Sequence, residues 1–480
     1  MDSKTTAPTV TGLRARVGAR LDATGQRQRW TLIAALVGMF ANGFPFTILA
    51  VSLGEVAREL GTDETTIAWV ITTPMLFSAV ALPMLGKLGD LKGHRRVFLF
   101  GSTSAAIIAA TTGLAWSVGS LIALRTLASV LGGATGPSSM ALIFRVIPPV
   151  ERTRAMGWWS MTGAGAPAVG LIAGGPLVDL VGWRSVFLLQ ALFAFCALLL
   201  AWLVLPETPP KRVRFDVPGA LTLAIGVGGL LFGVSQLRGA RLSDPKIWAP
   251  MMLGALGLLA FLAIERRAAE PLLPLEFFTR RNFTAPIVTM SFMGAAYMGA
   301  FVLAPLVLQQ VFGLTVSAAA GLMLLRTLTL SLSSPLGGLL GARRGERFAA
   351  FTGTFMIAAS MLLLASGTEN GWLVLVGVGL VFQGLGQGLC LPSLNSVVAG
   401  AVPADDLGIA TGASRLTNQI GTAIGIALVT MAYGGDPDGF DRGFLLGAVF
   451  AAVSAIGSLF VLPHRAVASA NIDPKEGTES

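Results

Sequence analysis

Apolar residues in this chain are gathered into long runs, and nearly all charged residues fall in the short gaps between them. A membrane-crossing helix needs about 20 mostly apolar residues, because the hydrocarbon core of a bilayer is about 30 Å thick. Fourteen runs are of this order of length, at 31–53, 67–86, 97–114, 119–143, 155–178, 185–205, 217–237, 248–265, 282–311, 316–340, 349–366, 371–394, 408–433 and 443–462. The pattern therefore predicts an all-α integral membrane protein with 14 transmembrane helices.

Composition excludes several other classes of protein. Hydrophobic residues make up 54% of the chain and charged residues only 12%, which is too little charge for the surface of a soluble domain. The net charge of +9 is dispersed over short loops, so it indicates membrane topology and no nucleic-acid partner. Cys196 and Cys390 each stand alone in an apolar run, and no cluster of histidines or acids lies at catalytic depth. We expect no enzyme activity, no cofactor and no metal site.

The positions of lysine and arginine predict the orientation. If the N-terminus lies inside, 25 of the 34 Lys and Arg fall on the cytoplasmic side, 6 fall outside and 3 lie within predicted helices. Cytoplasmic loops of membrane proteins carry an excess of these residues. We therefore expect a multi-pass protein of the plasma (inner) membrane with cytoplasmic tails at 1–30 and 463–480.

The most charged gap, GKLGDLKGHRR from Gly86 to Arg96, has a partial copy later in the chain. The segment Gly338–Arg347 repeats its two glycines, a leucine and an arginine, although Ala342 stands at the place of Asp90. Each copy follows the second helix of a six-helix block, at 31–205 and 282–462. Two related bundles are the basis of alternating access, and 206–281 then forms a linker with two inserted transmembrane helices.

These residues resemble the signatures of the major facilitator superfamily. The first gap matches the loop signature Gly-x-Leu-x-Asp-x-x-Gly-x-Arg-Arg, and Arg125 in LRTLASVLGGATGP is similar to the arginine signature of helix 4. The segments PLLPLEFFTRRNFTA (271–285) and LQQVFGLTVSAAAGL (308–322) resemble the fourteen-helix drug:proton antiporter branch. The resemblance implies two pseudo-symmetric six-helix bundles, with the two-helix insert between them.

The fifth predicted helix, at 155–178, is similar to the antiporter signature Gly-Pro-x-x-Gly-Gly of the same family. The glycines of the signature are matched by Gly170, Gly174 and Gly175, while Leu171 stands at the place of the proline and Pro167 lies nearby. Glycines at this spacing let helices touch backbone to backbone, and prolines allow bending. Pro167, Gly170, Gly174 and Gly175 are therefore candidates for a hinge. Tight packing without a hinge is the alternative.

The charged loop is a candidate gate formed by Gly86, Asp90, Gly93, Arg95 and Arg96. Asp90 can accept hydrogen bonds from the amides of a helix end, or pair with an arginine. We expect Arg95 and Arg96 to pair with acids on neighbouring loops, such as that of Glu151. In the family, this loop steadies the outward-open state. The alternative is that the loop only fixes topology through its charge.

Three arginines inside predicted helices bear on the substrate. Each costs about 2.5–3.5 kcal/mol at the centre of a bilayer, so each is a functional candidate unless it only locks helix packing. Together with nearby amides they form the predicted substrate cavity, which consists of Arg125, Arg326, Arg415, Asn42, Gln309, Gln383, Gln387 and Asn418.

No acid accompanies these arginines in the predicted helices. None of the 25 Asp and Glu falls near the middle of a run, since Glu55, Asp179 and Glu265 lie at helix ends. We expect His94 and His464 to lie in water. A proton antiporter for cations needs a buried carboxylate, so this pattern favours an anionic or amphiphilic cargo.

The resemblance implies a secondary transporter that exports small amphipathic compounds, such as drugs, antibiotics or natural products, by alternating access with proton coupling. The buried arginines support two alternatives. One is a voltage-assisted exporter of organic anions, because a membrane potential supplies about 2.3 kcal/mol per charge per 100 mV. The other is a flippase for lipid-like acids. The expected partners are this cargo, the bilayer, and a proton or the membrane potential as the driving force, and we expect a monomer.

Overall fold

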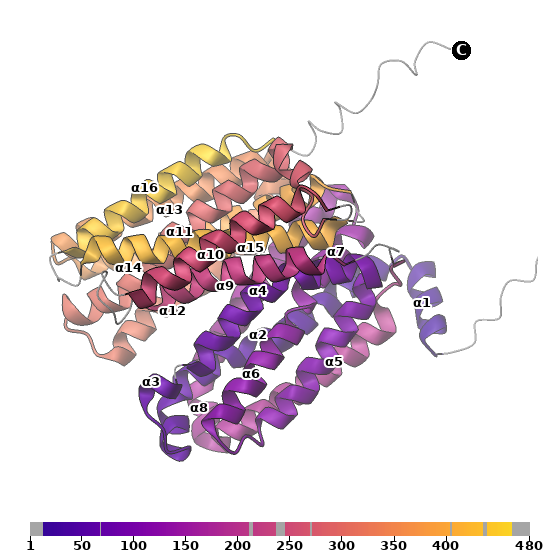
Figure 1. The fold of residues 1–480 in the computed structure, drawn as a ribbon, viewed down its shortest axis with the longest axis horizontal. Coiled ribbons are helices and arrows are strands. Elements are labelled where there is room, and N and C mark those ends of the chain that lie inside the picture. Colours follow the sequence, from indigo (N-terminus) through magenta and orange to yellow (C-terminus); the bar gives the residue numbers. More distant parts are fainter. Residues whose placement is uncertain are drawn as a thin grey trace, which may run out of the picture.

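The fold consists of helices that run beside one another (Figure 1). The computed structural model describes residues 13–67, 69–210, 215–236, 245–268, 271–403, 406–434 and 439–462, and every regular element in these ranges is a helix. The predicted C-terminal tail at 463–480, the first part of the N-terminal tail and His464 lie outside these ranges.

The first part of the chain forms ten helices within the ranges described. They are α1 (Leu13–Ala23), α2 (Arg27–Glu59), α3 (Glu64–Ile67), α4 (Trp69–Lys92), α5 (His94–Thr112), α6 (Val118–Gly132), α7 (Thr135–Val146), α8 (Pro149–Val204), α9 (Val217–Ser235) and α10 (Pro245–Glu265). The helix α1 lies in the predicted N-terminal tail and contains three arginines and one aspartate among its 11 residues. The helix α8 covers two predicted helices, and its backbone breaks at Gly182. Gly182 has a φ of 74°, which glycine adopts without the steric cost that other residues meet.

The later part continues with a short 3-10 helix and six further α-helices. They are η2 (Leu275–Thr279), α11 (Arg281–Gln310), α12 (Val316–Arg344), α13 (Glu346–Glu369), α14 (Leu373–Gly400), α15 (Leu407–Tyr433) and α16 (Phe440–Ser458). Each predicted run from 282 to 462 thus corresponds to one helix.

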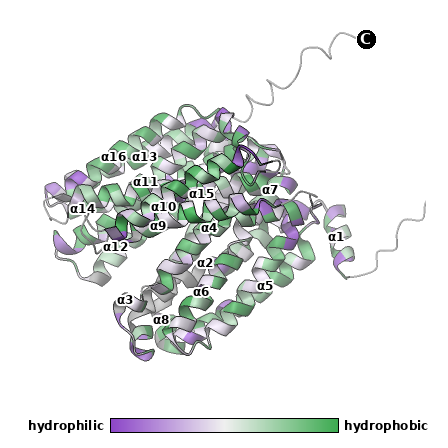
Figure 2. Ribbon diagram, in the orientation of Figure 1, coloured by the Kyte–Doolittle hydropathy of each residue, from purple (hydrophilic) through white to green (hydrophobic). Residues whose placement is uncertain are grey.

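Hydrophobic residues, drawn in green, occur along most of the helices (Figure 2). Ten helical segments among the residues described are long and apolar enough to cross a membrane. The predicted runs 31–53, 97–114, 155–178 and 408–433 are also helical but are not among these ten. The apolar helices indicate a multi-pass membrane protein, and the number fourteen stays a prediction.

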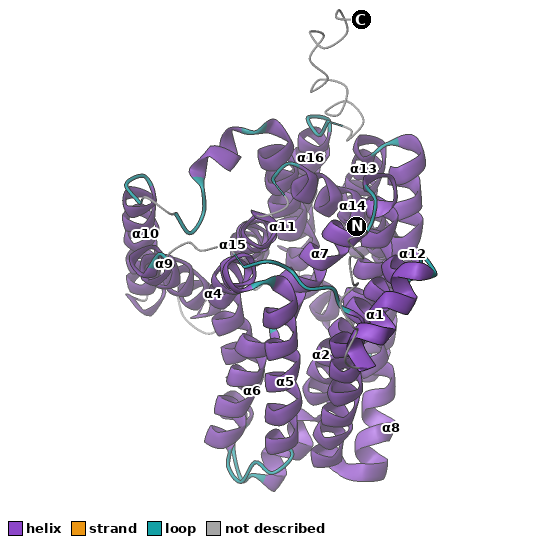
Figure 3. Ribbon diagram, turned by 90° about the vertical axis from the view of Figure 1, so that its right-hand side faces the viewer, coloured by secondary structure: helices purple, strands orange, loops and turns teal. Residues whose placement is uncertain are grey.

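Packing brings helices from distant parts of the chain together. In the first part, α2 and α5 pack on α8, while α4 packs on α6; in the later part, α11 packs on α15, α12 on α14 and α13 on α16. The pairs α4 with α15 and α8 with α12 join these parts. The helices α9 and α10 pack against each other at the periphery, where α9 lies beside α4 and α15 (Figure 3).

Candidate functional site

The charged segment Gly86–Arg96, which we predicted as a loop, is mostly helical: it forms the end of α4 and the start of α5, with Gly93 between them. The end of α4 lies against the start of α15. Gly86 is so close to Gly408 that a Cβ atom on Gly86 would collide with the Gly408 carbonyl oxygen. Asp90 accepts hydrogen bonds from the backbone N–H groups of Gly408 (3.0 Å) and Ile409 (2.9 Å). The Asp90 residue is only 4% exposed. We call this contact of Gly86 and Asp90 with Gly408 and Ile409 the junction.

Asp90 complements the positive N-terminal end of the α15 dipole. The first turn of α15 contains no acidic residue, and Asp406 at its N-cap does not cap the helix with its side chain, so the hydrogen-bonded carboxylate at this helix end comes from α4. Of the two contacts considered for Asp90, the structure contains the one with the amides of a helix end. The role of this contact in gating stays a prediction.

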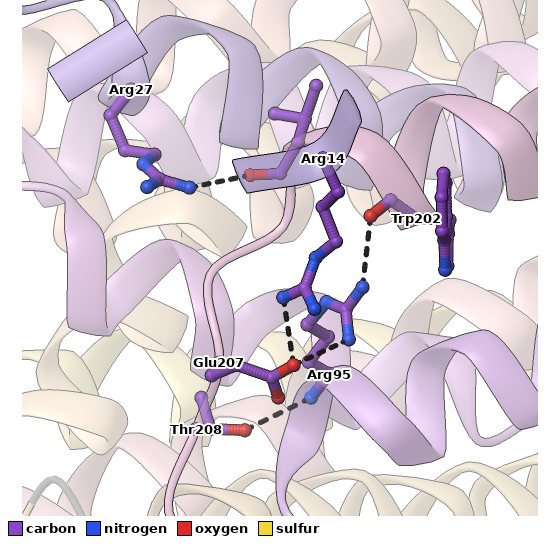
Figure 4. Close-up of polar contacts among 7 residues, drawn as sticks. Arg14, Arg27, Arg95, Trp202, Glu207 and Thr208 are labelled. Atoms are coloured by element: carbon purple, nitrogen blue, oxygen red, sulfur yellow. Dashed lines mark hydrogen bonds and ion pairs between the residues drawn. The ribbon is translucent and has the colours of Figure 1, made fainter. Parts of the chain in front are cut away.

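Arg95 pairs with Glu207, an acid on the loop after α8, so its partner is of the expected kind, although it is not the example Glu151. The Arg95 guanidinium donates to Glu207 (2.9 Å) and to the carbonyl oxygen of Trp202 (2.9 Å) (Figure 4). Arg14 of α1 also pairs with Glu207, at 2.8 Å. The segment after α8 folds back along the start of α5, and this brings Glu207 within reach. Burial lowers the pKa of Arg95, while the charge of Glu207 opposes this shift.

The two residues beside Arg95 differ sharply in exposure. Arg96 is exposed, whereas His94 is 1% exposed and its Nε2 lies 3.0 Å from Asp90 Oδ1. The expectation that His94 lies in water is therefore wrong. Gly93, with a φ of 93°, makes the turn from α4 to α5 and directs His94 inward against Gly89. A side chain at Gly93 would also meet the carbonyl oxygen of Thr208.

The repeated segment Gly338–Arg347 forms the end of α12 and the start of α13, and it has the same backbone turn. Gly345 has a φ of 98° at the start of α13, as Gly93 does at the start of α5. Here α12 lies against α8, and Gly338 approaches the backbone of Thr153 and Gly157. We call this contact the second junction. Thr153 adds a hydrogen bond from its hydroxyl to Glu346 (3.0 Å).

A cavity of about 330 Å³ lies among α2, α4, α5, α6, α7, α8 and α15. Its polar lining includes Asn42, Arg125, Thr135, Gln190, Arg415 and Gln419. The Arg125 guanidinium lies 5.3 Å from the ring centre of Phe187, and that of Arg415 lies 4.8 Å from the ring centre of Trp159. Among the ion pairs of the described part of the chain, none includes either arginine. The arginines are therefore held by aromatic faces and not by acids.

Arg326 is buried elsewhere, on α12. It does not line this cavity, and its guanidinium lies 3.8 Å from the ring centre of Tyr297 and 4.3 Å from that of Phe301. Gln383 is fully buried, and its amide has no hydrogen-bond partner within the described ranges. Gln387 likewise has an unpartnered side-chain oxygen there. These three predicted cavity residues lie on α12 and α14, away from Arg125 and Arg415.

Two other predicted cavity residues use their side chains for packing. The Asn418 amide donates to the carbonyl oxygen of Met290 on α11 (2.6 Å), and the Gln309 amide donates to that of Pro305 on its own helix (3.1 Å). Gln190 and Gln419 line the cavity although the prediction did not include them. Both had a signal, since Gln419 follows Arg415 by one helical turn and Gln190 is the only amide in its apolar run.

The predicted hinge residues Pro167, Gly170, Gly174 and Gly175 all lie in α8, ahead of the break at Gly182. Nearby, a Cβ atom on Gly165 would lie 2.8 Å from the hydroxyl oxygen of Ser331 on α12, so the two helices are close here. The hinge role stays a prediction.

Comparison with known proteins agrees with this architecture. The chain is 31% identical over 407 residues to "Multidrug resistance protein Stp" of Mycobacterium tuberculosis, a match that covers 84% of this chain and 75% of that protein. It is 28% identical over 415 residues to the "Tetracenomycin C resistance and export protein" of Streptomyces glaucescens, covering 86% and 77%.

Solved structures show the same fold. The human organic anion transporter MFSD10 (TETRAN) superposes with a TM-score of 0.63 at 18% identity, covering 91% of this chain and 99% of that chain. The proton:xylose symporter XylE superposes with a TM-score of 0.65 at 12% identity, covering 90% and 95%. The family model of the Major Facilitator Superfamily matches residues 35–425 and 286–480. With this match and these relatives, the chain belongs to the Major Facilitator Superfamily, a family of transporters and not of enzymes.

Proposed function

We propose that the protein exports small amphipathic compounds across the membrane. One observation carries the proposal: a polar cavity enclosed by helices from both parts of the chain, with Arg125 and Arg415 in its lining. The names of the two relatives, a multidrug resistance protein and an antibiotic resistance and export protein, support export as the direction.

The proposed architecture has fourteen spans and cytoplasmic termini. In it, 31–205 and 282–462 form two pseudo-symmetric six-helix bundles, while 206–281 supplies the inserted pair α9 and α10. The matching turns at Gly93 and Gly345 support a repeat. The junction then closes the cavity on the cytoplasmic side, and the cargo enters when α4 and α15 separate.

A second candidate is voltage-assisted export of organic anions. It is favoured by the cavity lining, which contains two guanidinium groups and no carboxylate among the residues described. An anion that leaves a cell with a negative interior gains about 2.3 kcal/mol per charge per 100 mV. Proton coupling, which the family resemblance implies, would need an acid outside this lining.

Transport by the full chain in liposomes distinguishes these candidates. Matched anionic, neutral and cationic fluorescent amphiphiles are tested with a pH gradient and a voltage imposed separately. Arg125→Gln and Arg415→Gln should each remove a charge-assisted hydrogen bond between the guanidinium and the bound anionic probe. Such a bond is worth about 1.5–3 kcal/mol, so the apparent affinity for the anion should fall roughly 10- to 100-fold.

Arg326→Gln is the matched control, because it removes an equally buried guanidinium outside the cavity. It leaves the preference for the anion unchanged. Equal transport of all three probes, with no effect of either cavity substitution, would overturn the anion proposal. No export of any probe by wild type would contradict the export proposal, and movement of labelled phospholipids instead would identify a flippase.

A further inference from the structure

Two carboxyl groups meet at the base of the inserted pair α9 and α10. Glu265 is the last residue of α10 and is 4% exposed, and its Oε1 accepts a hydrogen bond from the backbone N–H of Leu273. Asp216 precedes α9, and its Oδ1 accepts from the N–H of Gly219 at 2.9 Å. Each carboxyl group thus uses one oxygen to fix its own helix end or loop.

The second oxygens of these groups face each other. Glu265 Oε2 and Asp216 Oδ2 are buried, and neither has a hydrogen-bond donor in the described ranges. A Cβ atom placed on Gly219 would lie against both of them, at 3.0 Å from Glu265 Oε2. The two side chains also lie within hydrogen-bonding reach of each other.

An ionised carboxylate can only accept hydrogen bonds, so two ionised groups in this position repel and leave two buried acceptors unsatisfied. One proton changes this, because the protonated group donates to the other and both oxygens are then satisfied. We propose that Glu265 and Asp216 form a proton-binding site that holds one shared proton. The proton comes from solvent and forms an O–H bond on one carboxyl group, and the charge of the pair changes from −2 to −1.

Lys87, near the end of α4, links this pair to the junction. Its Nζ donates to the carbonyl oxygen of Pro271 at 2.7 Å, and its charge also acts on Glu265. Asp216 and Lys87 are the charged groups of the described chain that act on Glu265, while Arg266 and Arg267, which follow it, are exposed. A pair with one proton therefore balances the single charge of Lys87.

The proposed site couples protonation to the junction. With the proton present, the start of α9, the end of α10 and the segment that contains Pro271 and Leu273 are held together beside Lys87, one residue after Gly86. When the proton leaves, repulsion between Glu265 and Asp216 separates α9 from α10 at this end. The site lies outside the central cavity, so the inference goes beyond the proposed transport function and depends on no particular cargo.

Infrared difference spectroscopy on the full chain in lipid nanodiscs tests the site directly. A protonated carboxyl group gives a C=O band that is absent from an ionised one. We expect the wild type to show this band at neutral pH and to lose it on alkaline titration. Glu265→Gln and Asp216→Asn should each abolish the band, and Glu276→Gln, at an exposed acid of η2, should leave it unchanged.

A matched measurement needs no substitution. In wild-type protein with ¹³C-labelled aspartate and glutamate carboxyl groups, the band must shift, which assigns it to an acidic side chain and not to lipid; the substitutions then assign it to the pair. A wild-type spectrum with no band at neutral pH would overturn the proposal, and so would a band that survives in folded Glu265→Gln.

Discussion

Replacing Asp90 with alanine should open the junction. The substitution leaves the N–H groups of Gly408 and Ile409 without the acceptor that now lies 3.0 and 2.9 Å away, and it removes the negative charge from the N-terminus of α15. A hydrogen bond to a charged group contributes about 1.5–3 kcal/mol, and one carboxylate serves both donors here. The desolvation of the buried carboxylate opposes this gain.

We therefore expect a net loss of about 3 kcal/mol from the closed junction, which is a shift of roughly 150-fold in the equilibrium between closed and open junctions. Asp90→Asn should give a smaller shift, because the amide keeps one of the two acceptor oxygens while it loses the other and the charge. The exposed neighbour Arg96 offers a control, and Arg96→Ala should leave the equilibrium unchanged.

Double electron–electron resonance measures this equilibrium as a distribution of distances. Spin labels are placed at the exposed residues Lys92 and Pro403, on the two sides of the junction, in a chain with Cys196 and Cys390 replaced. Wild type should show a dominant short distance, and Asp90→Ala should transfer this population to longer distances. If folded Asp90→Ala keeps the wild-type distribution, the carboxylate does not hold the junction and the electrostatic reasoning is refuted.

Two further substitutions test the second junction and the far end of α2. Gly338→Ala places a Cβ atom 2.7 Å from the Thr153 carbonyl oxygen, so it should lower the stability of the protein in thermal unfolding by about 1–3 kcal/mol. The control Gly377→Ala, with open space around it, should not lower the stability. Equal effects of the two substitutions would contradict the steric argument. Glu59 accepts a hydrogen bond from the Trp183 indole and pairs with Arg184, and these contacts lower the pKa of Glu59. The contribution of Glu59 to the free energy of unfolding is therefore fully present above the ordinary glutamate pKa and is lost as the pH falls through the lowered pKa. Glu59→Gln should remove this part of the acid dependence of stability, and an unchanged pH profile would show that the pair contributes nothing measurable.

Local patterns in the sequence were sufficient to predict an all-helical membrane chain and to name helix-end amides as one of two candidate partners of Asp90. Long apolar runs leave a membrane chain few choices besides helices, and a lone acid between two glycines suits a helix end. The partner of Arg95 was beyond such reasoning. Glu207 is 112 residues away, and only the path of the chain after α8 brings it to α5.

The direction of each polar side chain was also beyond local reasoning. Asn418 and Gln419 are neighbours on α15, yet the first contacts α11 and the second lines the cavity. Successive residues differ by about 100° around a helix, so the rotational position of α15 about its axis decides which amide faces the cavity, and tertiary packing sets that position. The same holds for Arg326, which the packing of α12 turns toward Tyr297 and Phe301.

At each junction the partial positive charge at the start of a helix is met by a carboxylate, but the carboxylate comes from a different place. This difference explains why the repeat is incomplete at Asp90. Asp406 at the N-cap of α15 does not cap the helix with its side chain, and the first turn has no acid, so the amides of Gly408 and Ile409 take their acceptor from α4. The first turn of α8 contains Glu151, so this helix carries its own negative charge, and Ala342 can stand where Asp90 stands in the first copy. The junction between α4 and α15 is therefore the one whose closure depends on charge, while the second junction depends on the close backbone contact at Gly338. A change in charge near α4, such as the uptake of a proton by Glu265 and Asp216, then acts on one side of the molecule and leaves the contact between α8 and α12 in place.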